Sequence, residues 1–147
     1  MTKKEIVPLE EALAQARAIA PKLAASTDAL NKSIVEVEAA LKSLRLGVSA
    51  SVLLDMDDDR GWQRHLTFAK RDKEWHLLIE EFDDREDVTW EPLTNSSREI
   101  RLKSVRALSE LVVELVRAAE EELQEVTSAT ASVKEFAASL KSREEGT

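Results

Sequence analysis

Two long apolar repeats, one near each end of the chain, most constrain what this sequence can fold into. In the first, apolar or small residues recur at alternating spacings of four and three from Leu9 to Leu44. The second begins at Val105 and ends at Leu140, with a stutter between Ala119 and Leu123. Such repeats form one stripe along an α-helix and are typical of coiled coils. We therefore predict helices over residues 8–46 and 98–140, and a frayed tail over 141–147.

Proline, glycine and a capping pattern mark the ends of these helices. The chain has only three Gly and three Pro in 147 residues, which favours long regular elements. Pro21 lies inside the first repeat without changing its phase, so we expect one helix that is kinked near Pro21. The alternative is a break, with a second helix beginning at Pro21. Gly47 follows the first helix, and Ser96 with Glu99 forms a capping-box pattern before the last one.

The middle of the chain, residues 48–93, has the alternation of β-strands. Three strands are predicted to form an antiparallel meander, and a fourth piece over 88–93 is a candidate edge strand. We predict that Lys70 pairs with Trp75, and that His65 consequently lies opposite Glu80. The core face is then expected to hold Val52, Leu54, Leu66, Phe68, Trp75, Leu77 and Ile79.

These elements predict an α+β fold in one domain, 1–147, with a long helix, the meander and a second long helix. The helices are expected to run antiparallel with coiled-coil-like seams. A helix of about 40 residues is about 60 Å long, whereas a strand of about six residues covers about 20 Å. The small sheet therefore cannot cover both seams, and we expect a homodimer formed through the helices. The element order is similar in outline to that of the YbaB-type nucleoid-associated proteins, which are dimers, so the resemblance implies a nucleic-acid-binding dimer as an alternative function.

The composition argues against several classes of function. The absence of cysteine excludes disulfides, thiolate metal sites and cysteine nucleophiles, and fits a cytoplasmic location. No apolar run is long enough to cross a membrane, and the charged residues near the N-terminus do not fit a signal peptide. The net charge of −8 is concentrated in residues 47–97, which would repel a phosphate backbone. From the lack of a membrane-spanning run we expect no membrane partner, and from the acidic charge we expect no nucleic-acid partner.

Asp55, Asp57 and Asp59 have the alternating oxygen ligands of a calcium loop, so they are weak candidates for a metal site. The position that requires Gly in that loop is Arg60, which favours an ordinary acidic hairpin tip instead. His65 and Glu80 across two strands, with Ser49, Ser51 and Thr67 nearby, resemble part of a catalytic triad. No nucleophile elbow or glycine-rich loop accompanies them, so an enzyme that depends on a metal or small ligand is only the second alternative. We assign no catalytic residue and expect no cofactor.

Two further groups are candidates for binding. Basic residues crowd the first turns of the last helix and are weak candidates for an anion site: Arg98, Arg101, Lys103 and Arg106. The preferred interpretation is that they pair with the acidic segment 80–87 of the same chain. The outer sheet face and that acidic segment are candidates for contact with another protein, through Leu53, Leu78, Phe82, Glu80, Asp83 and Asp84. The first functional hypothesis is therefore a non-enzymatic interaction or structural module that self-associates through its helices.

Overall fold

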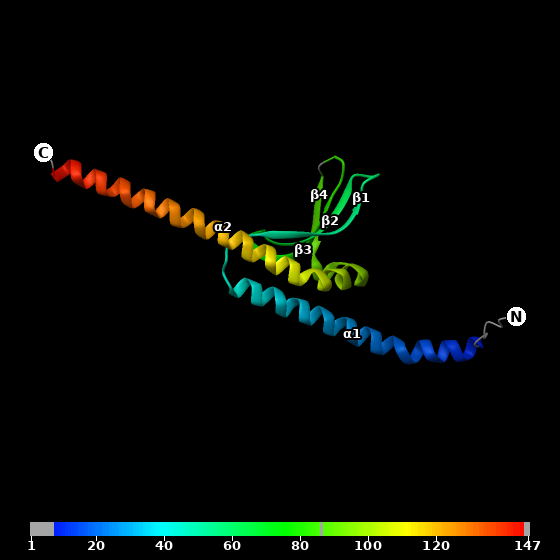
Figure 1. Cartoon of the computed structure of the whole chain (residues 1–147). Coiled ribbons are helices and arrows are strands. Elements are labelled where there is room, and N and C mark those ends of the chain that lie inside the picture. Colours follow the sequence, from blue (N-terminus) through cyan, green and yellow to red (C-terminus); the bar gives the residue numbers. More distant parts are fainter. Residues whose placement is uncertain (1–7, 86, 146–147) are drawn as a thin grey trace. The chain divides into compact units, whose positions relative to one another are not determined.

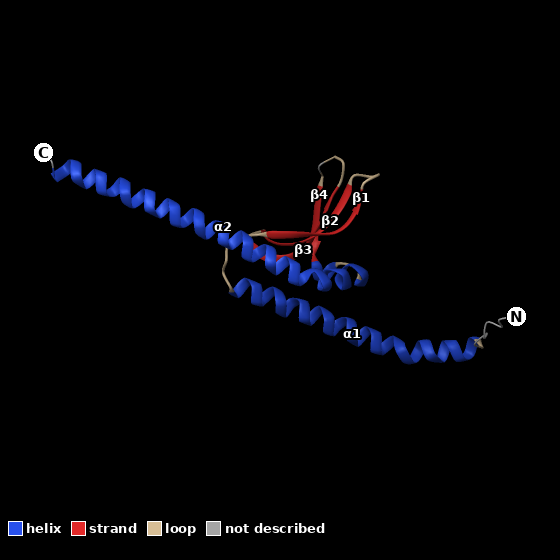
Figure 2. Ribbon diagram, viewed as in Figure 1, coloured by secondary structure: helices blue, strands red, loops and turns tan. Residues whose placement is uncertain are grey.

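A computed structural model describes residues 8–85 and 87–145 and has the predicted α+β fold (Figure 1). A long helix, a four-stranded antiparallel sheet and a second long helix follow one another (Figure 2). The elements are α1 (Leu9–Ser43), β1 (Ala50–Asp57), β2 (Trp62–Arg71), β3 (Glu74–Phe82), β4 (Val88–Pro92), the 3₁₀ turn η1 (Leu93–Asn95) and α2 (Arg98–Glu145). The candidate fourth strand is therefore present, and Pro92 ends it.

The first helix, α1, continues through Pro21, so the interpretation as a single helix is confirmed and the alternative of a break is wrong. Figure 1 shows that the ribbon of α1 bends in its first half, as a proline inside a helix requires. Its seam residues Leu9, Leu13 and Leu23 are exposed.

The chain divides into two compact units, and the boundary between them falls between Leu41 and Lys42, near the end of α1. The first unit contains a single helix, and the second contains the sheet and α2. A lone helix has no core of its own, so the division does not make α1 an independent domain. The single domain and the antiparallel helices therefore stay predictions.

The sheet has the strand order β1-β2-β3-β4 and the predicted register between β2 and β3. Lys70 pairs with Trp75, and His65 pairs with Glu80. Between these strands, Asp72 and Lys73 both have positive φ, of 52° and 72°. Positive φ at both central residues belongs to the two-residue hairpin turn whose twist matches that of the strands.

A β-bulge in β1 changes the face on which Asp55 lies. The pairing with β2 shifts between Leu53 and Asp55, so Leu53 pairs with His65 and Asp55 pairs with Arg64. Simple alternation would place Asp55 on the outer face with Ser51. The extra residue at the bulge instead turns Asp55 toward the face that packs on α2.

The core of the second unit lies between one face of the sheet and the first half of α2. Strands β1 and β2 contact α2. Buried apolar residues on this sheet face are Val52, Leu66, Phe68, Leu77 and Ile79, and on the helix Leu111 and Leu115. Phe68 and Trp75 stack with ring centroids 5.4 Å apart. Of the predicted core face, Leu54 is only half-buried, because the bulge takes it out of the alternation.

Helix α2 begins at Arg98, as predicted, and ends five residues later than predicted, at Glu145. The Oγ atom of Ser97 accepts a hydrogen bond from the backbone N–H of Ile100, at 3.3 Å, so Ser97 rather than Ser96 is the N-cap. Ser96 is buried instead. The tail predicted to fray is helical as far as Glu145, while residues 146 and 147 lie outside the described part of the chain.

Candidate interaction surfaces

A ladder of polar side chains crosses the outer face of the sheet. Nε2 of His65 lies 2.9 Å from Oε1 of Gln63, and Nδ1 of His65 lies 3.2 Å from Oγ of Ser51. The amide oxygen of Gln63 only accepts, so Nε2 of His65 donates to it. The hydroxyl groups of Ser51 and Thr67 share a hydrogen bond of 2.9 Å. Each of these groups is satisfied by the next, which is the behaviour of a cross-strand polar ladder.

Glu80 does not join this ladder. It lies opposite His65 in the register, yet its carboxylate accepts a hydrogen bond from Arg71 at 2.9 Å and is 7% exposed. The predicted pairing of His65 with Glu80 is therefore wrong at the level of side chains, because the nearby guanidinium provides a charged partner. Glu80 is also too buried to contact another protein through its carboxylate.

The apolar residues predicted on this face differ in accessibility. Leu53 is exposed, and Phe82 is partly exposed and packs edge-on against His65 with centroids 5.1 Å apart. Leu78 is fully buried, so its expected exposure is wrong. It lies in an inner strand between Thr67 and Pro92, and the turn η1 contacts the same strand.

Asp83 and Asp84 shape the turn between β3 and β4. The Asp83 carboxylate accepts hydrogen bonds from the backbone N–H groups of Arg85 and Asp87, at 2.9 Å and 3.1 Å. The Asp84 carboxylate lies directly against Gly61, where a Cβ would collide with it, and Gly61 has a φ of +59°. Both carboxylates are exposed, so their predicted contact with a protein partner stays a prediction.

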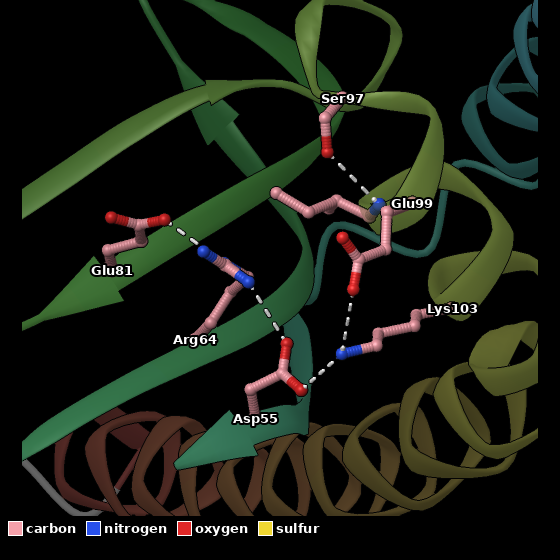
Figure 3. A network of polar contacts seen from close by, with 7 residues as sticks. Asp55, Arg64, Glu81, Ser97, Glu99 and Lys103 are labelled. Carbon is pink, nitrogen blue, oxygen red and sulfur yellow. Dashed lines mark hydrogen bonds and ion pairs between the residues drawn. The ribbon is translucent and has the colours of Figure 1, made fainter. Parts of the chain in front are cut away.

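Asp55 is the centre of a charged network between the sheet and α2 (Figure 3). It accepts hydrogen bonds from Nζ of Lys103 at 2.8 Å and from Arg64 at 3.0 Å. Lys103 also lies 3.8 Å from Glu99, one turn earlier in α2. The Lys103 ammonium, with Arg64, lowers the pKa of the Asp55 carboxyl below its ordinary value of 3.8, although partial burial acts in the opposite direction.

An open cleft of about 820 Å³ adjoins this network. Arg64 donates to Glu81 at 3.0 Å and lies over the ring of Trp62, 4.6 Å from its centroid. Charged side chains from the two hairpin tips and from α2 supply most of the remaining wall. Small-molecule sites are mostly apolar with few polar groups, so this cleft does not have the lining of one.

The acidic turn between β1 and β2 does not assemble a metal site. Oδ1 of Asp57 accepts from the backbone N–H groups of Asp59 and Arg60, at 3.2 Å and 3.4 Å. Asp55, the third predicted ligand, is engaged by its two cationic partners. Over residues 8–85 and 87–145, no three acidic or histidine side chains group closely enough to hold a metal ion. Asp57 therefore acts as a turn-forming residue.

The four basic residues at the start of α2 are separated by the structure. Arg101 is buried and its Nε lies 3.5 Å from the Ser97 carbonyl oxygen. Lys103 pairs with Asp55, whereas Arg98 and Arg106 are exposed. Internal pairing is thus confirmed for Lys103, but its partner comes from β1 and not from the segment 80–87. The bulge in β1, which alternation does not reveal, supplies that partner.

Helix α2 carries two different apolar stripes, which the sequence prediction merged into one. The inner stripe faces the sheet and holds Arg101, Ser104, Leu108, Leu111, Leu115 and Ala118, all buried or half-buried. The outer seam repeats at alternating spacings of three and four without a stutter: Leu102, Val105, Ser109, Val112, Val116, Ala119, Leu123, Val126, Thr130, Val133, Ala137 and Leu140. The prediction included Leu108 and Leu115, which belong to the inner stripe, and it missed Leu102 and Val116. The unbroken spacing from Leu102 was the signal that could have separated them.

Beyond the sheet, α2 continues as a projecting segment, residues 121–144, in which every side chain is exposed. Figure 1 shows this half of α2, coloured orange to red, extending away from the strands. Its seam residues Leu123, Val126, Val133 and Leu140 are between 49% and 66% exposed. The projecting segment thus carries an exposed apolar seam.

Comparison of the chain with protein-family models, curated proteins and solved structures finds no match in any of the three. No helix within residues 8–85 and 87–145 combines the length and apolar character that crossing a membrane requires.

Proposed function

We propose that this protein is a non-enzymatic interaction module that self-associates through its long helices. The observation that carries the proposal is the projecting segment of α2, an exposed helix whose outer seam keeps the coiled-coil period to Leu140. An isolated helix is marginally stable in water, and most helices in proteins are stabilised by packing of an apolar face. A second helix laid along the seam supplies that packing.

The size of the seam is consistent with a stable contact. Full burial of a Val or Leu side chain stabilises by about 1.5–3 kcal/mol, and each copy contributes Leu123, Val126, Val133 and Leu140. Their partial exposure reduces this gain, yet the sum remains comparable with the cost of association, about 4–15 kcal/mol. The exposed seam residues of α1, Leu9, Leu13 and Leu23, offer further surface of the same kind.

The proposal can be tested by placing charge on the seam. Val126→Glu with Val133→Glu should weaken self-association at least about a hundredfold, because two carboxylates per chain would be buried against apolar side chains. Ser128→Glu with Ser132→Glu is the matched control, since it adds the same charge to exposed positions away from the seam. Sedimentation equilibrium measures the association, and circular dichroism checks that helix content is kept.

Equal association of the seam variant and the wild type would rule out the outer seam as the contact. Equal loss in both variants would show that net charge rather than seam burial controls association, and would also contradict the proposal.

A further inference from the structure

The charges beside the outer seam point to one orientation for the pairing, and this inference rests on the proposed self-association. We propose that the projecting segments of two copies pair antiparallel, so that Leu123 packs against Leu140 of the partner subunit. In the same register Val126 packs against the partner's Ala137, and Thr130 against the partner's Val133. Because the contact is two-fold symmetric, each of these pairs occurs twice.

This register matches the seam residues by size. The long side chains of Leu123 and Leu140 meet at both ends of the contact, whereas each valine meets alanine or threonine near the centre. Alternation of large and small residues across facing positions fills a helix interface evenly. The seam therefore gives one continuous set of layers along the projecting segment.

The charged residues that flank the outer seam are also complementary in this register. In an antiparallel coiled coil, a residue that flanks the seam lies beside a residue on the same flank of the other helix. Glu120 then lies beside the partner's Lys141, and Glu122 beside the partner's Arg143. Symmetry repeats both pairs, so the two charged groups at each end of the overlap meet opposite charges, while Lys134 lies beside the partner's Thr127. In this arrangement the acidic start of the segment lies beside the basic end of the partner's segment.

Other arrangements lose this complementarity. In a parallel pair, Glu122 lies beside the partner's Thr127, and Lys141 beside the partner's Phe136, so no opposite charges meet. An antiparallel shift of one heptad toward the C-terminus places Lys134 beside the partner's Lys134. A shift of one heptad toward the sheet places Glu120 beside the partner's Lys134, which is an opposite charge, but it places Glu122 beside the partner's Phe136.

The fold of the second unit accommodates the preferred register. The inner stripe that contacts the sheet ends at Ala118, whereas the overlap begins at Glu120. The two sheets therefore lie beyond opposite ends of the paired segments and do not compete for the same surface of α2. The overlap uses no residue of the sheet or of its acidic turns.

Cysteine cross-linking distinguishes the orientations directly, because the native chain contains no cysteine. In the antiparallel register, Val126→Cys in one copy meets Ala137→Cys in the other, whereas two copies of the same variant place their thiols about 16 Å apart along the helix axis. A disulfide requires Cα atoms within about 7 Å. Under mild oxidation, the mixture of the two full-length variants should form a cross-linked dimer, and each variant alone should not.

Charge reversal gives a second, independent readout. Glu120→Lys with Glu122→Arg in one chain, or Lys141→Glu with Arg143→Glu in another, should each weaken self-association about tenfold or more, because all four pairs become repulsive. An equal mixture of the two variants should regain wild-type affinity, because every pair is again opposite. Glu121→Lys with Glu125→Arg is the control, since it reverses two charges away from the seam and should change the affinity less than about threefold.

The outcomes separate this inference from the proposed function. A wild-type dimer in which each single-cysteine variant cross-links with itself is parallel; it overturns the orientation and keeps self-association. A dimer without cross-links in any combination, or without rescue in the charge mixture, also overturns the orientation. A wild-type monomer overturns both.

Discussion

At the scale of single residues, Asp55 links the sheet to α2 and carries the clearest electrostatic signature in the described chain. Its position follows from a bulge, and its two partners come from β2 and α2. Because Lys103 and Arg64 interact with the charged form, the pKa of the carboxyl is lower in the folded protein than in the unfolded chain. The network therefore couples packing of the helix on the sheet to pH.

This coupling predicts a defined acid dependence. A lowered folded-state pKa adds stability that is fully present above the unfolded pKa, near 4, and is lost as the pH falls through the folded value. Asp55→Asn should therefore lower stability at pH 7 and make its decline below pH 4 shallower than in the wild type. Urea unfolding at several pH values measures both effects. An unchanged slope below pH 4 would contradict the described contacts.

Ser104 is a second informative residue, because its hydroxyl is fully buried against the sheet and has no hydrogen-bond partner among the described residues. Ser104→Ala should raise stability by about 1–2 kcal/mol, since it removes a desolvated hydroxyl and improves helix propensity. The control Ser109→Ala lies on the exposed side of the same helix and should gain only about 0.5 kcal/mol. If urea unfolding gave equal gains for the two variants, the burial of an unpaired hydroxyl at Ser104 would be refuted.

At the scale of elements, the outer seam and the inner stripe give α2 two separate tasks. The inner stripe packs on the sheet and stabilises the second unit, whereas the outer seam is available for association. Residues on different faces of the helix should therefore respond differently to the same kind of truncation.

Leu111→Ala should lower the free energy of unfolding by about 2–5 kcal/mol, because its side chain is fully buried and its removal leaves a cavity. Val113→Ala should change it by less than about 0.5 kcal/mol, because that side chain is 55% exposed. Denaturant unfolding at one protein concentration measures both. Similar losses at the two positions would show that the helix faces are assigned wrongly.

The elements also show what the sequence could and could not reveal. Apolar alternation and a short turn were sufficient to predict the pairing of Lys70 with Trp75, because a one-residue slip would have exposed the core face. The bulge at Leu53 and Asp55 was not predicted, since local alternation does not show where an extra residue is accommodated. The partner of Lys103 was missed because Asp55 lies 48 residues earlier in the sequence. The partner of Glu80 was missed because the strand register places Glu80 opposite His65, whereas its ion pair is with Arg71 of the same hairpin. The capping residue was misplaced by one position, from Ser97 to Ser96, because both are serines.

At the scale of the whole molecule, the proposed function follows from the amount of uncovered apolar helix. Strands β1 and β2 contact α2, whereas every side chain over residues 121–144 is exposed. Arg45 and Leu46 line a hollow with the start of this segment, at Leu123 and Val126. A chain of this kind gains stability by associating with a helix of matching period. We propose a second copy of the chain as this partner, because its helix has the same apolar period and charges that are complementary in the antiparallel register.

The central claim is tested most directly by the molar mass of the full-length wild-type chain in solution across a concentration series. Sedimentation equilibrium from about 1 to 100 μM should show a rise toward twice the chain mass of 16.4 kDa, as expected for micromolar or tighter association. A mass that stays at 16.4 kDa throughout this range would contradict the account.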